Sequence, residues 1–205
     1  RMRNRAVAGA YHAACASGIY VFNWYADQDS KRELLTQIGS PDSLRGTDKI
    51  YAATHRYVRN EGPWRGALRN DRIHGEVPVA LKRTLTGDGP TIKLAVADDL
   101  AADISKRIEL RVRLRQWVKG DIVRLVWDGA EGTNVQTRYD IEKASTANPF
   151  AADIYDVGPA VWLSSVLSAG DVAMGEHSVK VVLVERHPQM VCDIVLTDVE
   201  LVITY

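Results

Sequence analysis

Two different hydrophobic patterns divide this chain. Within residues 3–16 apolar side chains recur at helical spacing, and a continuous apolar run follows from Ile19 to Phe22. From Val77 to the end, apolar and polar residues alternate instead, as in strands that bury one face. The first pattern predicts a helix leading into a buried strand, and the second predicts an all-β region.

The first part is expected to be a helix-strand-helix unit. The helix runs from Arg3 to Ala16, stops at Ser17-Gly18 because glycine adopts the left-handed conformation, and leads into a strand from Gly18 to Trp24. A short second helix follows over Asp27 to Ile38. A strand with apolar residues on both faces suits a parallel sheet, and the chain shows no further helix-strand repeats to supply its neighbours. We therefore expect the unit to be the end of something larger. The apolar stripe of the first helix consists of Val7, Ala10, Tyr11, Ala14 and Cys15.

Residues 46–76 are polar and basic, with Gly62-Pro63 in their middle, so we expect a linking region with one short strand from Lys49 to Thr54. Beyond it, turn signals such as Gly87-Asp88-Gly89-Pro90 separate seven or eight short strands. The predicted fold class is mainly β, an antiparallel β-sandwich of the jelly-roll kind, preceded by the helix-strand-helix unit. The expected divisions are residues 1–45, 46–76 and 77–205.

The alternation also predicts the individual strands and the core between the sheets. Arg111, Arg113 and Arg115 fall on the other face of one strand, where we expect water and acidic neighbours rather than the uronate or sulfate groups of a ligand. The expected strands are Val77 to Arg83, Thr91 to Ala97, Ile108 to Leu114, Ile122 to Trp127, Ala160 to Val166, and residues 179–183 and 195–203. The expected core includes Ile108, Leu110, Val112, Leu114, Val181, Leu183, Val199 and Leu201.

Composition narrows the class of partner. The 205 residues include 26 basic and 26 acidic side chains, so the net charge gives no reason to expect nucleic acid or an anionic membrane as a partner. No stretch is long and apolar enough to span a bilayer, and the first residues lack the order of a signal peptide. Cys15 and Cys192 are far apart and in no metal-binding spacing, which favours two buried thiols over a disulfide.

Both ends of the chain resemble parts of a known family. The opening, GAYHAACASGIYVFNWY, resembles the end of the (β/α)₈ barrel in glycoside-hydrolase-like proteins of environmental bacteria, and IGSPDSLRGTDKIYAAT is similar to the segment that leaves that barrel. The end of the chain, from GEHSVKVVLVER to LTDVELVITY, is similar to the last strands of the galactose-binding-like jelly rolls appended to such enzymes. The resemblance at the opening rests on Ala13, Ala14, Ser17, Gly18, Ile19, Tyr20, Phe22 and Asn23, and that of the exit segment on Gly39, Pro41, Leu44, Lys49 and Tyr51.

The resemblance implies that the first unit is the remnant of an α/β barrel. The sandwich would then be a non-catalytic accessory module that packs on the upstream barrel domain or holds carbohydrate. A complete barrel takes about 250 residues, so the carboxylate pair of a glycosidase would lie mostly upstream of Arg1. We therefore expect no catalytic residue and no cofactor in this chain, and a secreted or periplasmic location. The alternatives are a structural or protein-interaction module, and a self-sufficient hydrolase, which the missing carboxylate pattern disfavours.

Three residues are candidates for carbohydrate binding. Asn23 and Trp24 stand at the carboxyl end of the presumed barrel strand, where barrels place their active sites. Trp24 would either stack on a sugar ring or pack beneath the loop that leaves the strand. Trp117, Trp127 and Trp162 are candidate sugar platforms on the sandwich, although most of them are expected to pack in the core or at a sheet edge. Trp127 is kept as the candidate, as an exposed ring.

Other polar groups give weaker indications of chemistry. Asp27 and Asp29 suit loop solvation and helix capping better than a carboxylate pair. The histidines show no metal-ligand spacing. Asp128, Glu131 and Asn134 offer oxygen atoms near a turn without the EF-hand order, so no metal site is predicted, and a calcium ion there is the alternative.

Overall fold

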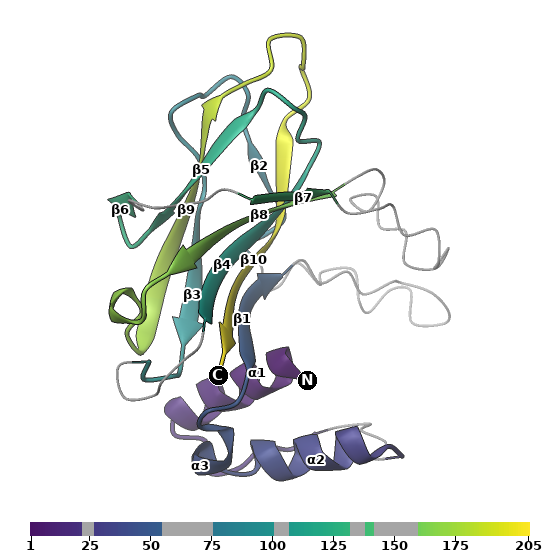
Figure 1. Ribbon diagram of the computed structural model, residues 1–205, viewed down its shortest axis with the longest axis vertical. Coiled ribbons are helices and arrows are strands. Elements are labelled where there is room, and N and C mark those ends of the chain that lie inside the picture. The colour runs from purple at the N-terminus through teal and green to yellow at the C-terminus, as the bar shows by residue number, and fades with distance from the viewer. Residues whose placement is uncertain (22–26, 55–75, 101–106, 132–137, 142–159) are drawn as a thin grey trace, which may run out of the picture.

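Two antiparallel sheets pack face to face in this protein (Figure 1). The computed structural model describes residues 1–21, 27–54, 76–100, 107–131, 138–141 and 160–205. The larger sheet follows the order β1 (Lys49–Thr54), β10 (Ile194–Thr204), β4 (Arg107–Arg115), β8 (Ala160–Leu167) and β7 (Arg138–Ile141), and β2 (Val79–Leu81) also pairs with β10. The smaller sheet follows the order β3 (Thr91–Val96), β9 (Gly175–Glu185), β5 (Ile122–Trp127) and β6 (Ala130–Glu131).

The connections follow a jelly-roll pattern. From β2 to β5, and again from β8 to β10, each strand lies in the sheet opposite the strand before it. As a result β2, β10, β4 and β8 form one sheet and face β3, β9 and β5 in the other. This confirms the predicted fold class, a mainly β antiparallel sandwich.

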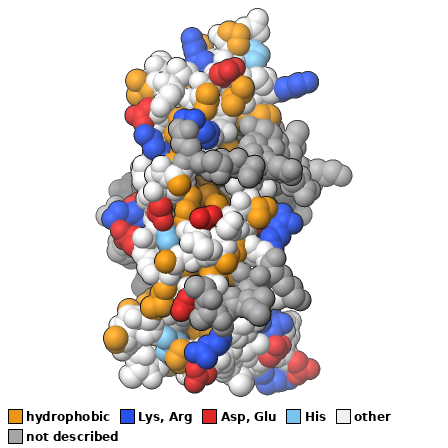
Figure 2. Space-filling view, turned by 60° about the vertical axis from the view of Figure 1, so that its left-hand side comes forward, with side chains coloured by type: hydrophobic (Ala, Val, Ile, Leu, Met, Phe, Trp, Pro, Cys, Tyr) orange, Lys and Arg blue, Asp and Glu red, His pale blue; other side chains and the backbone are white. Residues whose placement is uncertain are grey.

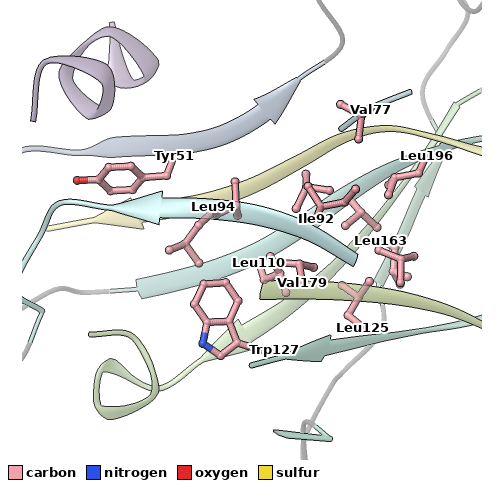
Figure 3. Packing of buried hydrophobic residues seen from close by; sticks show 14 of the residues in the cluster. Tyr51, Val77, Ile92, Leu94, Leu110, Leu125, Trp127, Leu163, Val179 and Leu196 are labelled. Atoms are coloured by element: carbon pink, nitrogen blue, oxygen red, sulfur yellow. The ribbon is translucent and has the colours of Figure 1, made fainter. Parts of the chain in front are cut away.

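The core lies between the sheets, where the alternation predicted it. Each of the eight core residues named from the sequence is at most 2% exposed. Figure 3 shows side chains of this core, including Leu94, Leu110 and Val179, pointing into the space between the sheets. The alternation does not hold at the end of β4. Arg115 was expected on the solvent-exposed face, but it is only 5% exposed. β4 ends there and the chain turns at Gln116, whose φ is +61°, which explains the break in the pattern.

Three helices lie at the end of the sandwich where β1 begins and β10 ends (Figure 1). They are α1 (Met2–Ala13), α2 (Asp29–Ile38) and α3 (Pro41–Leu44), and a short 3₁₀ helix covers Ala169–Asp171. Ala6 of α1 belongs to the core of the sandwich, whereas Ala8 packs with Leu34, Ile38 and Leu44 in a small cluster of its own. The first helix therefore packs against the sandwich. None of the described helices is long and apolar enough to cross a membrane.

The first helix differs from its prediction in two respects. It ends at Ala13, because Cys15 already takes the left-handed conformation with φ +66° and the amide of Ala16 donates to the carbonyl of Tyr11. The predicted stop at Gly18 is therefore wrong. The predicted stripe is also wrong, since Val7 and Tyr11 are about half exposed while the small residues face the rest of the molecule. Small side chains bring the helix close to the sandwich, which a spacing argument does not capture.

The predicted strand from Gly18 to Trp24 is only partly within the described residues. Residues 18–21 form no strand, and residues 22–26 lie outside the described part of the chain. Ile19 and Val21 instead pack on the small cluster that contains Leu34. Without neighbouring strands their backbone groups have no ladder to join, so the apolar run serves helix packing.

The strand expected in the linking region belongs to the sandwich. β1 pairs with β10 along its whole length, from Lys49 opposite Ile203 to Thr54 opposite Asp198. The sandwich therefore extends back to Lys49, before the expected start at Val77. β6 and β7 were not predicted, because both are too short for alternation to reveal. The expected burial of the two thiols is wrong as well, since Cys15 and Cys192 are both free and exposed.

Candidate functional site

A cleft lined by both polar and apolar residues lies between the helices and the sandwich, with a volume of about 500 Å³. This size falls within the range typical of small-molecule sites. Its walls come from segments far apart in sequence: α1, the end of α3, the start of β1, the loop after β3 and the turn before β9. The lining residues are Gly9, His12, Ala13, Pro41, Leu44, Arg45, Lys49, Ala97, Asp98, Asp99 and Met174.

Small residues on α1 allow the helix to approach the sandwich at this point. A Cβ atom added to Gly9 would lie 3.6 Å from the Cβ of Ala97 and 3.7 Å from the hydroxyl of Tyr51. Figure 3 shows the ring of Tyr51 extending from β1 toward this end of the molecule. A large side chain at Gly9 would therefore displace the helix or occupy the cleft.

A buried ion pair forms the floor of the cleft. Nζ of Lys49 lies 2.9 Å from Oδ1 of Asp98, and the two side chains are 1% and 9% exposed. The ammonium group also donates to the carbonyl oxygens of Leu44 at 2.7 Å and Thr47 at 3.3 Å. Its three N–H groups are thereby satisfied. Lys49 thus ties the end of α3 to the sandwich and holds Asp98 in place.

The second oxygen of Asp98 is not satisfied in this way. Oδ2 is buried and has no hydrogen-bond partner, and the same is true of the nearby hydroxyl of Tyr51. Burial raises the pKa of Tyr51, and the negative charge of Asp98 raises it further, so the phenol stays neutral. Unsatisfied buried polar atoms are uncommon in folded proteins and costly. The two groups lie next to each other in the protein interior, where the charge of Asp98 acts on the Tyr51 hydroxyl.

His12 lines the cleft, and its ring nitrogens contact the backbone near the ends of two helices. Its Nδ1 lies 3.3 Å from the carbonyl oxygen of Ala16, and its Nε2 lies 3.0 Å from that of Ile38. The ring therefore joins the end of α1 to the end of α2. Both ring nitrogens thus lie within hydrogen-bonding distance of carbonyl oxygens of the protein itself. The geometry gives His12 a positioning role in the wall of the cleft.

Of the three residues predicted to bind carbohydrate, only Trp127 is among the described residues. Asn23 and Trp24 lie outside the described residues. Trp127 is 5% exposed, its ring stacks on His177 with centroids 4.6 Å apart, and its Nε1 donates to the carbonyl oxygen of Asp171 at 2.8 Å. Figure 3 shows this ring pointing into the core. The expectation that Trp127 is an exposed ring is therefore wrong, because the alternation of β5 places residue 127 on the inner face.

In the turn that follows Trp127, the carboxylate of Asp128 binds other groups of the protein. Oδ2 of Asp128 lies 2.6 Å from Nδ1 of His177, and Oδ1 accepts from the amide of Ser178 at 2.7 Å. Burial by itself would raise the pKa of Asp128, but these hydrogen bonds outweigh burial and lower it. Asn134 lies outside the described residues. Across the parts of the chain that the structure describes, no group of three His, Cys, Asp or Glu side chains is arranged to hold a metal ion.

The arginines on the outer face of β4 pair with acids on β10. Arg111 lies 2.5 Å from Glu200 and Arg113 lies 3.6 Å from Asp198. Arg3 of α1 also pairs with Glu200, which is fully buried. The prediction of acidic partners on a neighbouring strand is confirmed for Arg111 and Arg113. These pairs leave less positive charge for an anionic ligand.

Asp27 and Asp29 also bind neighbouring side chains. Asp27 pairs with Lys31 at 2.5 Å, and Asp29, in the first turn of α2, pairs with Arg32. The hydrogen bond from Lys31 lowers the pKa of Asp27. Both carboxylates are exposed, which agrees with the prediction of solvation. The predicted capping role is wrong, because α2 begins at Asp29 with Gln28 as its N-cap and without a side-chain capping hydrogen bond.

Sequence reasoning did not find the cleft. Lys49 was noted only as the start of a strand and as part of a resemblance, and Asp98 was not singled out. Their sequence separation is large, and a single lysine or aspartate beside a strand has no distinctive spacing. No protein-family model matches this chain, and no curated protein matches it. Its function is therefore argued from the site itself.

Proposed function

We propose that this chain is a non-catalytic accessory β-sandwich module of a glycoside-hydrolase-like protein, and that it binds carbohydrate. The observation that carries the proposal is the cleft between the helices and the sandwich, which has the size of a small-molecule site and is lined by both charged and apolar side chains. Sugars are recognised by such acceptors together with neighbouring donors. The jelly-roll architecture and the resemblance at both ends of the chain are consistent with this role.

The chemistry of the cleft favours binding over hydrolysis. Glycosidases use two carboxyl groups on opposite sides of the scissile bond, one of them able to donate a proton. In this cleft the carboxylate of Asp98 is paired with the ammonium group of Lys49. His12 has both ring nitrogens engaged. Neither group is positioned as a general acid.

The first test combines a hydrolysis assay with a glycan array, both on the purified chain. We expect no turnover of aryl glycosides or polysaccharides, and weak binding to a subset of glycans, because a single small cleft offers few contacts. Met174→Trp is the matched variant: Met174 lines the cleft and is 59% exposed, so a larger side chain there blocks the cleft without entering the core. Turnover that disappears when an internal Asp or Glu is replaced would overturn the non-catalytic assignment.

The second candidate function is a structural or protein-interaction module. Val7 and Tyr11 on α1 and Leu35 on α2 are exposed apolar side chains at the helical end of the molecule. Figure 2 shows hydrophobic, acidic and basic side chains mixed at that end, around grey atoms that are not described. Such a surface suits contact with another domain, and the upstream barrel of the parent protein is the proposed partner. A glycan array without any binding would favour this second function.

A further inference from the structure

We propose that protonation of His177 closes a clasp that holds one wall of the cleft, so that the position of Met174 in this wall depends on pH. The clasp consists of the His177 ring, the carboxylate of Asp128 and the carbonyl group of Ala173. Met174, which follows Ala173, lines the cleft and is 59% exposed. The clasp acts on the wall itself, so it operates whichever ligand the cleft takes.

The ring of His177 lies between two hydrogen-bond acceptors. Its Nδ1 lies 2.6 Å from Oδ2 of Asp128, and its Nε2 lies 2.6 Å from the carbonyl oxygen of Ala173. A neutral imidazole carries a hydrogen on only one nitrogen, whereas an imidazolium carries one on both. Both contacts are therefore hydrogen bonds only when the ring is protonated. His12 also faces two carbonyl oxygens, but at 3.0 and 3.3 Å and without a carboxylate.

The charged groups around this ring come from three elements. Asp128, in the turn after β5, binds the ring directly. Lys93 on β3 and Glu176 on β9 lie on the outer face of the smaller sheet, where they pair with each other at 2.8 Å. Asp171 is exposed and meets the uncharged ring of Trp127 through its carbonyl oxygen. Among these described groups, Asp128 is the one that responds to the charge of the imidazole.

The turn before β9 is built so that its middle can move while its two sides stay in place. Val172 is 1% exposed and packs in the core. Gly175 has a φ of +143°, a conformation that favours glycine, and it starts β9. Ala173 and Met174 between them are both exposed. The carbonyl group of Ala173 can therefore turn away without disturbing the core.

The direction of the pH dependence follows from these hydrogen bonds. In the protonated ring, Nδ1 donates to Asp128 and Nε2 donates to Ala173, so the turn is held. When the pH rises and the ring loses a proton, the remaining hydrogen stays on Nδ1, because a carboxylate is a stronger acceptor than a carbonyl group. The lone pair of Nε2 then faces the carbonyl oxygen of Ala173 and repels it. Met174 is therefore held at lower pH and released at higher pH.

The test is NMR spectroscopy of the whole chain across the range in which histidines usually titrate, roughly pH 5–8. We expect both ring nitrogens of His177 to carry a hydrogen at the lower pH and only Nδ1 at the higher pH. The methyl signal of Met174 should shift in one step with the same midpoint. His177→Gln should abolish this step, because the glutamine side chain does not titrate. His187→Gln is the matched control and should keep the step, since His187 lies in the loop after β9, outside the cleft.

Two results would overturn the proposal: a Met174 signal that does not follow the titration of His177, and a step that persists in His177→Gln. If His177→Gln does not fold, Asp128→Asn decides. Asparagine tolerates the left-handed conformation that residue 128 adopts, with φ +46°, and it removes the negative charge that favours the imidazolium. The step in the Met174 signal is then expected at a lower pH than in the original protein. An unchanged midpoint would contradict the clasp.

Discussion

Replacing Asp121 with asparagine is expected to lower the free energy of unfolding by about 3–5 kcal/mol. The carboxylate binds the guanidinium group of Arg83, and both side chains are almost completely buried. It also accepts from the backbone amides of Val118 at 3.0 Å and His187 at 2.8 Å. Asparagine keeps the shape but leaves Arg83 as an uncompensated buried charge. Three loops at the end of the sandwich opposite the helices would lose their common anchor.

Chemical denaturation followed by tryptophan fluorescence measures this loss. Asp88→Asn serves as the control, because Asp88 and its partner Lys180 are both at the surface and the variant should unfold almost like the original protein. A loss in Asp121→Asn no larger than in the control would contradict the anchoring role. The three loops meet because Arg83 also donates to the carbonyl oxygens of Cys192 at 2.6 Å and Gln116 at 2.9 Å.

The same carboxylate makes part of the stability depend on pH. Burial acting alone would raise the pKa of Asp121, but the hydrogen bonds from Arg83, His187 and Val118 outweigh it and lower the pKa below the unfolded value of 3.8. A lowered folded pKa means that the stabilisation is present above pH 3.8 and is lost as the pH falls through the folded pKa. Asp121→Asn should therefore show a weaker dependence of stability on pH in this acidic range.

Leu201→Ala is expected to cost about 2–5 kcal/mol, whereas Val202→Ala should cost under roughly 1 kcal/mol. Leu201 lies opposite Leu110 in the middle of the larger sheet and is fully buried. Val202 is its neighbour on β10, points to the outer face and is only partly buried. Removing three carbon atoms from the core leaves a cavity, but the outer face remains in contact with solvent.

The comparison of adjacent residues tests the register of β10 directly. A shift by one residue would move every side chain of the strand to the other face. Equal losses in the two variants, or a larger loss in Val202→Ala, would contradict the pairing of β10 with β4. Urea unfolding measures both variants under one set of conditions, and a similar denaturant dependence in each would indicate that the unfolded states are comparable.

The strands and core of the sandwich could be predicted because they follow from the alternation of apolar and polar residues within single strands. In β4 and β10, apolar residues at every second position separate the core face from the wet face, so the strands and the core residues follow from short windows of sequence. The ion pairs of Arg111 and Arg113 follow from the same rule, since a charged row on one strand requires compensation from its neighbours. No long-range information is needed for these features.

The helical end and the cleft depend on contacts that a linear pattern does not contain. The first helix buries its small residues and exposes Val7 and Tyr11, because its position is set by how closely it approaches Tyr51 and Ala97. Asp98 and Lys49 meet only because β1 begins at the place in the fold where β3 ends. Trp127 was misassigned for a related reason: stacking capacity is a property of the residue, but exposure depends on the sheet that covers it.

The central claim is that the cleft beside Asp98 binds a sugar, and chemical-shift mapping by NMR tests it most directly. A neutral hexoside is titrated into the isotope-labelled chain while the backbone amide signals are followed. We predict concentration-dependent shifts at Gly9, Ala97 and Asp98, with the amides of β5 and of the three loops around Asp121 unchanged. Saturating shifts elsewhere on the sandwich, with Gly9, Ala97 and Asp98 unaffected, would contradict the claim.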